Sequence, residues 1–263
     1  MLQEKRQAEI LNIIRERNFV DNCDLQKLFK VTSITIRRDL KVLSQQKLIK
    51  KVHGGALSID DPITTIEPLY KTKSYINIKK KEAIGNAAIK FIENGDTIIF
   101  DTGTTTYQIA KRLKNNKFEN INIITNDIKI AYDLGNFGNL RIFVIGGELK
   151  NFLYSLSGTM CVNFLDNLKA DKIFLSADAI NLECISNSSI EDVPIKQKMI
   201  ESSKEVILVA DSSKYDKQAF CKVCMWDQID FVISNNETPK KYVDLFIKRK
   251  INYKFTDILE GEI

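Results

Sequence analysis

Histidine is almost absent from this sequence, since His53 is the single example among 263 residues. Histidine-based catalytic triads and multi-histidine metal sites are therefore excluded for residues 58–263. No run of about 18 apolar residues occurs, and the first residues lack the apolar segment of a secretion signal. We therefore expect a cytoplasmic protein without a membrane partner.

The cysteines do not indicate disulfide or metal chemistry. The chain has five cysteines, an odd number, and their positions lack the spacing of a disulfide framework. Cys221 and Cys224 form one CxxC pair, with no second pair and no neighbouring histidine. We expect reduced, mostly buried thiols, with no metal site and no cofactor.

Positive charge is concentrated at the N-terminus. The net charge is +5, and residues 1–57 contain 12 Lys and Arg against 6 Asp and Glu, which leaves 27 against 28 for residues 58–263. This asymmetry favours a polyanion partner for the first segment and a nearly neutral body for the rest.

Residues 31–56 carry the strongest functional signal. Thr32 is placed to cap a helix, and Ile36, Leu40 and Leu43 form one buried stripe along it. The other faces are small, polar and basic, and Arg binds guanine or phosphate through two parallel hydrogen bonds. A basic two-stranded wing is expected at 48–56. The residues expected to contact DNA are Thr32, Ser33, Thr35, Arg37, Arg38, Lys41, Lys50, Lys51 and His53.

Two more helices are expected before this block, at 3–17 and 25–30. Three helices and a wing predict a winged helix-turn-helix domain over residues 1–57, with operator DNA as its partner. The alternative is a small helical bundle whose charged face is only solvated.

The rest of the chain predicts an α/β domain. Residues 58–79 have no sustained apolar period and are expected to form a linker. In residues 80–263, strand candidates alternate with helical patterns, which predicts a mostly parallel sheet covered on both faces, a three-layer α/β fold. The expected strands are 97–100, 121–125, 140–145, 172–175, 205–210 and 231–234. The expected helices lie near 80–93, 105–114, 127–134, 159–168, 190–203 and 239–249.

Polar and glycine-rich segments follow these strands, where ligands collect in parallel sheets. The segment 101–106 is typical of an anion site, because backbone N–H groups and threonine hydroxyls coincide with a helix start; it is neither a Walker loop nor GxGxxG. Singly, each residue could equally be a helix cap or a solvated loop residue. Together they predict a site for a phosphorylated, polyhydroxyl ligand, formed by Asp101, Thr102, Gly103, Thr104, Thr105, Thr106, Asn126, Gly146, Gly147, Glu148, Asp178 and Lys214.

Several motifs follow one another along the chain: Thr-Ile-Arg-Arg-Asp-Leu at 35–40, His-Gly-Gly-Ala at 53–56, Asp-Thr-Gly-Thr-Thr at 101–105, Thr-Asn at 125–126, Gly-Gly at 146–147 and Asp-Ser-Ser-Lys at 211–214. With these motifs in this order, the sequence resembles the DeoR family of bacterial transcriptional regulators over nearly the whole chain. The resemblance implies an operator-binding winged helix. It also implies a C-terminal domain similar in fold to ribose-5-phosphate isomerase and glucosamine-6-phosphate deaminase, which senses a phosphorylated sugar without converting it.

The resemblance implies roles for particular residues. Residues 101–106 look like the phosphate loop, and Lys196 and Lys214 look like the family lysines on the following helix and strand end. The sugar-facing groups look like Asn126, Gly147, Glu148 and Asp178.

The chain also departs from the family pattern. Where the family usually has Gly-x-Asp-Gly-Ile, this chain has Ser176, Ala177 and Ala179 around Asp178, and side chains in place of glycine should hinder a close approach of the backbone to the ligand. Lys47 replaces the usual glycine before the wing, which suggests a different turn there.

The sequence therefore predicts a DNA-binding repressor of a sugar-utilisation operon that a phosphorylated sugar modulates. Such regulators bind paired half-sites, so a homo-oligomer, a dimer or tetramer, is expected. The alternative is a sugar-phosphate isomerase or deaminase carrying a DNA-binding domain. In it, Asp178 or Glu148 would abstract a proton and Lys196 or Lys214 would polarise a carbonyl.

Overall fold

The computed structural model describes residues 1–59, 63–64, 69–116 and 118–257. The chain divides into two compact units. The first comprises Met1–Pro62 and Ile66–Ile78, and the second comprises Ile63–Thr65 and Lys79–Ile263. Each unit has its own apolar core.

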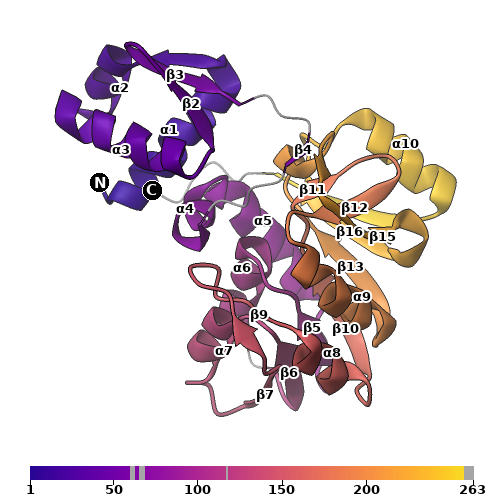
Figure 1. Cartoon of the computed structure of the whole chain (residues 1–263). Helices are drawn as coiled ribbons and strands as arrows, with labels where there is room; N and C mark the ends of the chain where they lie inside the picture. The colour runs from indigo at the N-terminus through magenta and orange to yellow at the C-terminus, as the bar shows by residue number, and fades with distance from the viewer. Residues whose placement is uncertain (60–62, 65–68, 117, 258–263) are drawn as a thin grey trace. The chain divides into compact units, whose positions relative to one another are not determined.

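The first unit is a winged helix-turn-helix (Figure 1), as the sequence predicts. Its helices are α1 (Gln3–Arg17), α2 (Asn22–Phe29) and α3 (Ser33–Gln45), and its three-stranded sheet has the order β1 (Phe19–Asp21), β3 (Gly55–Ser58), β2 (Ile49–Val52). The wing is the antiparallel β2–β3 hairpin. The additional strand β1 pairs with β3 and leads directly into α2.

A buried ion pair fixes α3 against α1. Ile36, Leu40 and Leu43 of α3 pack in the same core as apolar residues of α1. Asp39 of α3 is fully buried as well. Its carboxylate accepts hydrogen bonds from two residues of α1, from Arg6 Nε at 2.6 Å and from Gln7 Nε2 at 3.2 Å. Burial of Asp39 turns the preceding residues of α3 outward.

The segment 58–79, expected as a linker, contains regular structure. β4 is Ile63–Thr64, and α4 (Tyr70–Tyr75) packs against α1. The segment expected as a linker therefore contains a helix that belongs to the first unit. A six-residue helix with a buried Tyr70, followed by a buried Ile76, is too short to show an apolar period in the sequence.

Lys47 lies between α3 and β2 with a φ of 54°, in the left-handed region that favours glycine. The backbone N–H groups of Lys47 and Leu48 donate to the carbonyls of Ser44 and Leu43, which ends the helix. The different turn expected at this position is not found, since lysine adopts the conformation that glycine would take.

The second unit is built on a seven-stranded parallel sheet (Figure 1). Its strands are β5 (Thr97–Phe100), β6 (Ile121–Thr125), β7 (Leu140–Val144), β10 (Ala170–Leu175), β13 (Ser203–Val209), β16 (Phe231–Asn235) and β17 (Asn252–Thr256). Their spatial order is β17-β16-β13-β10-β5-β6-β7. The chain therefore winds one way from β5 to β7 and then returns to β10 on the other side of β5. The topological switch point lies between β5 and β10, where open α/β sheets bind ligands.

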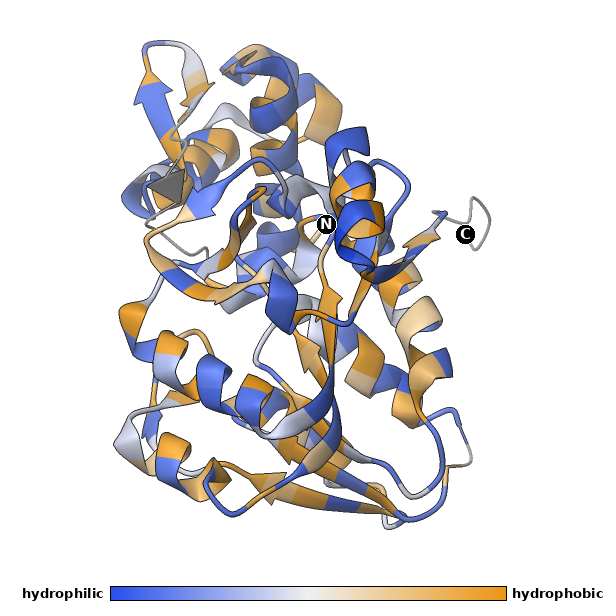
Figure 2. Cartoon of the chain, turned by 90° about the vertical axis from the view of Figure 1, so that its right-hand side faces the viewer, coloured by the Kyte–Doolittle hydropathy of each residue, from blue (hydrophilic) through white to orange (hydrophobic). Residues whose placement is uncertain are grey.

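Helices cover both faces of this sheet. Alternate residues of β5 enter different cores, with Ile99 on one side and Ile98 and Phe100 on the other. The Ile99 side is covered by α8 (Thr159–Leu165), α9 (Val193–Glu201) and α10 (Lys240–Arg249), and the other side by α5 (Ile78–Ala88), α6 (Thr104–Leu113) and α7 (Ile128–Leu134). Figure 2 shows mainly apolar strands between helices of mixed polarity. The predicted three-layer α/β fold is confirmed.

Smaller strands lie outside the main sheet. β11 (Ala179–Ile180), β12 (Cys184–Asn187) and β15 (Cys221–Met225) form an antiparallel sheet, β8 (Glu148–Leu149) pairs with β9 (Leu156–Ser157), and β14 (Gln218–Ala219) pairs with β4. The sequence predicted none of these strands and missed β17. In the part of the chain that is described, no helix combines the length and apolar character needed to span a membrane.

Replacing Asp39 with alanine is expected to destabilise the first unit by about 3 kcal/mol, because Arg6 would keep its buried charge without a partner. Urea unfolding followed by circular dichroism measures this loss. Asp24→Ala removes an exposed carboxylate from α2 and serves as the matched control, with a change of less than about 0.5 kcal/mol. Equal stabilities of the two variants would show that the buried pair does not hold α3 in place.

Candidate functional site

The outward face of α3 is polar and basic. Arg37, Arg38 and Lys41 are exposed, and Ser33 is half-buried. The Thr32 hydroxyl accepts from the Thr35 backbone N–H at 3.3 Å and lies 3.0 Å from the Thr35 hydroxyl. Thr32 therefore caps α3 as predicted.

The wing presents three more of the predicted DNA-contact residues. Lys50, Lys51 and His53 are all exposed on β2 and its turn. Gly54 has a φ of 82°, which a side chain disfavours, and a Cβ on Gly55 would lie 2.1 Å from the Val20 carbonyl oxygen. The two glycines of the His-Gly-Gly-Ala motif are thus needed for the turn and for close packing of β3 on β1.

A buried ion pair lies at the switch point of the large sheet. Asp101 follows β5, Ser176 follows β10, and Lys196 reaches them from α9. Lys196 Nζ donates to Asp101 Oδ2 and lies 3.2 Å from Ser176 Oγ. Ser176 also donates to Asp101 Oδ2 through its backbone N–H at 2.8 Å and its hydroxyl at 2.7 Å. Asp101 and Lys196 are both at most 2% exposed, so neither charge is compensated by water.

Asp127 holds the loop that begins at Asp101. It caps α7 by accepting from Lys129 and Ile130, and its Oδ2 accepts from the Thr102 hydroxyl at 3.1 Å and the Gly103 N–H at 3.3 Å. Burial raises the pKa of Asp127 to about 6, although these hydrogen bonds oppose the rise. Asp127 was not among the residues predicted for the site; its position before a helix was the available signal.

The threonines of the loop are packed into the unit. Thr104, Thr105 and Thr106 are all at most 6% exposed, and the Thr106 hydroxyl donates to the Gly103 carbonyl at 2.8 Å. A Cβ on Gly103 would lie 3.0 Å from the Ser176 side chain, so this glycine permits the close approach of the two loops. The predicted phosphate loop thus lies at the N-terminus of α6, at the switch point.

The loops after β6 and β7 contribute one unsatisfied acceptor. Asn126 Nδ2 donates to the Leu156 carbonyl at 3.1 Å, while Asn126 Oδ1 is buried and has no hydrogen-bond partner among the described residues. Gly147 has a packing role, because a Cβ there would lie 2.4 Å from Ser157 O and from Cys161 Sγ. The neighbouring Gly146 accepts a hydrogen bond from the Cys161 thiol. Glu148 is exposed in β8.

Asp178 and Lys214 lie on other loops. Asp178 accepts from the Ser188 N–H at 3.0 Å. Lys214 ends a short helical turn after β13 that Asp211 caps through Ser213. Burial alone would raise the pKa of Asp211, but the charges of Lys81 and Lys214 and the hydrogen bonds from Ser213 lower it.

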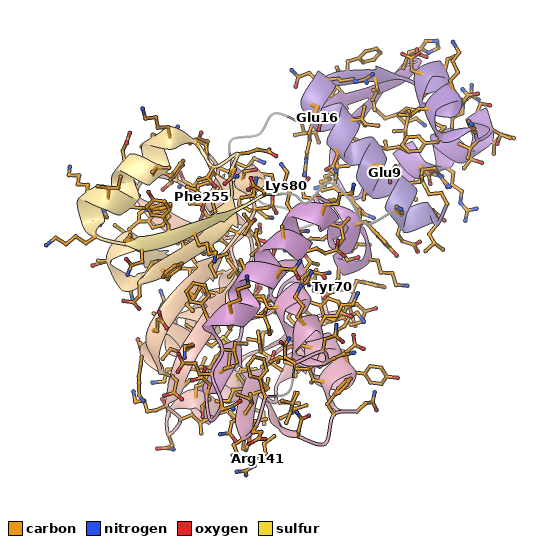
Figure 3. The ribbon with its side chains drawn as sticks, turned by 180° about the vertical axis from the view of Figure 1, so that it is seen from behind. Glu9, Glu16, Tyr70, Lys80, Arg141 and Phe255 are labelled. Atoms are coloured by element: carbon orange, nitrogen blue, oxygen red, sulfur yellow. The ribbon has the colours of Figure 1, made fainter. Side chains whose placement is uncertain are left out.

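Two lysines of α5 at the same edge of the sheet were not predicted from the sequence either. Lys81 is only 2% exposed beside Asp211, and Lys80 Nζ lies 3.3 Å from Ser212 Oγ and 2.5 Å from Glu237 Oε2. Figure 3 shows Lys80 at the end of this unit opposite to Arg141, which lies near the start of β7.

The structure therefore brings some of the residues predicted for the ligand site into contact, while the others lie on separate loops. Asp101, Thr102, Gly103 and Lys196 form one connected network with Ser176 and Asp127. Lys214 belongs to the loop after β13, which lies two strands from β5, about 10 Å at the usual spacing of strands. Across the described ranges, three or more His, Cys, Asp or Glu side chains nowhere gather as a candidate metal site.

The raised pKa of Asp127 makes a pH-dependent contribution to stability. A carboxyl that binds its proton more tightly when folded stabilises the fold fully below its unfolded pKa, near 3.8, and loses that contribution as pH rises through about 6. The stability of the wild type relative to Asp127→Asn should therefore fall by about 1–3 kcal/mol between pH 4 and 7. Fluorescence of Trp226, the sole tryptophan and buried in the second unit, reports this unfolding. A difference independent of pH would contradict a raised pKa.

Two family models match the chain. The DeoR-like helix-turn-helix domain matches residues 6–61, and the DeoR C-terminal sensor domain matches residues 76–236. Both describe regulators, so the alternative interpretation as an isomerase or deaminase gains no support from them.

Known proteins similar to this chain are also regulators. The HTH-type transcriptional repressor GlcR of Bacillus subtilis is 29% identical, with all of both chains covered. The transcriptional repressor AccR of Agrobacterium fabrum is 29% identical, with 96% of each chain covered. YulB of B. subtilis, an uncharacterized HTH-type transcriptional regulator, is 32% identical, with 95% of this chain and 96% of YulB covered.

Among solved structures, a D-ribose-5-phosphate isomerase in complex with phospho-erythronic acid is 17% identical with a TM-score of 0.38, covering 51% of this chain and 52% of the isomerase. The translation initiation factor eIF-2B of Pyrococcus horikoshii OT3 is 12% identical with a TM-score of 0.46, covering 88% of this chain and 87% of that protein. On the two family models, which together span both structural units, this chain belongs to the DeoR family of DNA-binding transcriptional regulators.

Proposed function

We propose that this protein represses a sugar-utilisation operon and that a phosphorylated sugar modulates its binding to the operator. The observation that carries the proposal is the exposed face of α3, where Arg37, Arg38 and Lys41 project from a helix whose opposite face is buried. A basic helix of this kind enters the major groove, and the basic wing adds contacts to the phosphate backbone. The names of GlcR and AccR support repression as the direction of control.

The carboxyl ends of the strands support a sugar as the effector. Asp101 Oδ1 and Asn126 Oδ1 are buried acceptors without a hydrogen-bond partner among the described residues, and they follow the neighbouring strands β5 and β6. A buried acceptor left unpaired is costly, and a hydroxyl group of a ligand would satisfy it. Two such acceptors on adjacent strand ends suit a ligand with several hydroxyls.

Positive groups at the same edge of the sheet support a phosphate on that ligand. The N-terminus of α6 follows Gly103 directly, and Lys214 and Lys81 lie after β13 and on α5. A helix N-terminus and lysines both stabilise an anion. The effector changes operator affinity by the difference between its affinities for the DNA-competent state and for other states of the protein. As expected for paired half-sites, we propose a homo-oligomer, a dimer or tetramer.

The first test concerns Arg38. If Arg38 binds a guanine with two hydrogen bonds, Arg38→Ala should weaken operator binding by about 1–3 kcal/mol and flatten base preference at that position. Fluorescence anisotropy at fixed salt, with an operator duplex and a random duplex, measures both effects. Lys27→Ala removes an exposed cation from α2 and serves as the control, since its loss should affect both duplexes alike. An equal loss on both duplexes for Arg38→Ala would make it a phosphate contact.

The second test concerns Lys214. Its replacement by alanine should leave operator affinity unchanged and raise the sugar-phosphate concentration needed for half-maximal release by about ten-fold or more, because a charge-assisted contact is lost. The measurement uses anisotropy with a panel of sugar phosphates and their unphosphorylated parents. Lys204→Ala is the matched control, since Lys204 lies at the opposite end of β13 and is 74% exposed. If Lys214→Ala gave the same release curves as the wild type while Trp226 fluorescence showed a folded second unit, Lys214 would be removed from the site.

A further inference from the structure

An apolar residue is exposed among the polar residues of the recognition helix. Ile34 lies in the first turn of α3, between Ser33 and Thr35, and its relative exposure is 76%. The apolar core of the first unit takes its contributions from α3 at Ile36, Leu40 and Leu43 and does not include Ile34. Ile34 is therefore the one residue of α3 that is both large and apolar and directed to solvent.

Ile34 shares a helix face with the basic residues. Arg37 follows by three positions, Arg38 by four and Lys41 by seven, so the four side chains form one row along α3. All four are exposed. This row lies opposite the stripe that packs into the core. A helix that lays Arg38 on a base edge therefore also lays Ile34 in the groove, one turn nearer the helix start.

The fold gains nothing from isoleucine at this position. An exposed β-branched residue is a poorer helix former than alanine and buries little apolar area. The helix start is already satisfied by Thr32, which accepts from the Thr35 N–H. The side chain is thus available for contact with another molecule.

The chemistry of the major groove selects one target for such a side chain. Isoleucine has no donor or acceptor, and the C5-methyl group of thymine is the one apolar substituent that the bases present in this groove. We propose that Ile34 contacts the C5-methyl group of one thymine in each half-site and so selects thymine there. This inference rests on the proposed insertion of α3 into the major groove.

The test removes the methyl group alone. Full-length protein first selects a tight-binding duplex from random DNA, and deoxyuridine then replaces each thymidine of one half-site in turn. One position should weaken wild-type binding by about three- to ten-fold, the range expected when a methyl contact is lost, and the other positions should change little. Ile34→Ala should bind the unmodified duplex about as tightly as the wild type binds the duplex with deoxyuridine at that position. The affinity of Ile34→Ala should not change when deoxyuridine replaces this thymidine.

Matched variants separate the possible outcomes. Leu2→Ala removes another exposed apolar side chain of the first unit, outside α3, and should keep the full deoxyuridine effect. Wild-type binding that is sequence-specific but insensitive to deoxyuridine at every position would overturn the inference and leave operator binding intact. Sensitivity that persists in Ile34→Ala would assign the methyl contact to another residue. A changed oligomeric state in Ile34→Ala would assign Ile34 to a protein contact. Failure of the wild type to select any sequence would instead overturn the proposed operator binding itself.

Discussion

The buried ion pair between Asp101 and Lys196 is the constraint on which the carboxyl edge of the large sheet depends. Both charges are removed from water, so each requires the other. The pair joins the end of β5 to α9 and, through Ser176, to the end of β10. Because β5 and β10 flank the switch point, this contact sets the distance between the loops that follow these two strands. The N-terminus of α6 is then fixed by Asp127, which holds Thr102 and Gly103 from the next strand.

The first unit uses a similar device for a different purpose. Asp39 is buried against Arg6, and the two arginines immediately before it in the sequence are exposed. Because neighbouring helix residues point in different directions, anchoring Asp39 and Leu40 inside orients Arg37 and Arg38 outside. The Arg-Arg-Asp-Leu motif thus combines two solvent-exposed residues with two buried ones. The carboxylate of this motif, Asp39, is buried and compensates the charge of Arg6, so it is not exposed on the basic face of α3.

The sequence predicts most of the main sheet because its central strands are short apolar runs bounded by polar turns. It does not predict β17, whose residues 252–254 are exposed at the sheet edge, so the strand shows no apolar run. The order of the strands depends on which neighbours pair, and this is a tertiary property that no local pattern records. For the same reason Lys81 was missed, since only the fold brings this lysine of α5 beside Asp211.

Ser176 shows how a departure from the family pattern can be accommodated. The expectation was that a side chain here would hinder a close approach of the backbone to the ligand. In the structure, Ser176 and Lys196 together direct three donors to Asp101 Oδ2, while Asp101 Oδ1 keeps no partner among the described residues. The Ser176 hydroxyl thus donates to the same carboxylate oxygen, Oδ2, that Lys196 contacts. A Cβ on Gly103 would lie 3.0 Å from the Ser176 side chain, so a larger residue at 103 would need this serine to shift by a few tenths of an ångström. The serine and the lysine thus satisfy one oxygen of the Asp101 carboxylate and leave the other buried oxygen without a partner among the described residues.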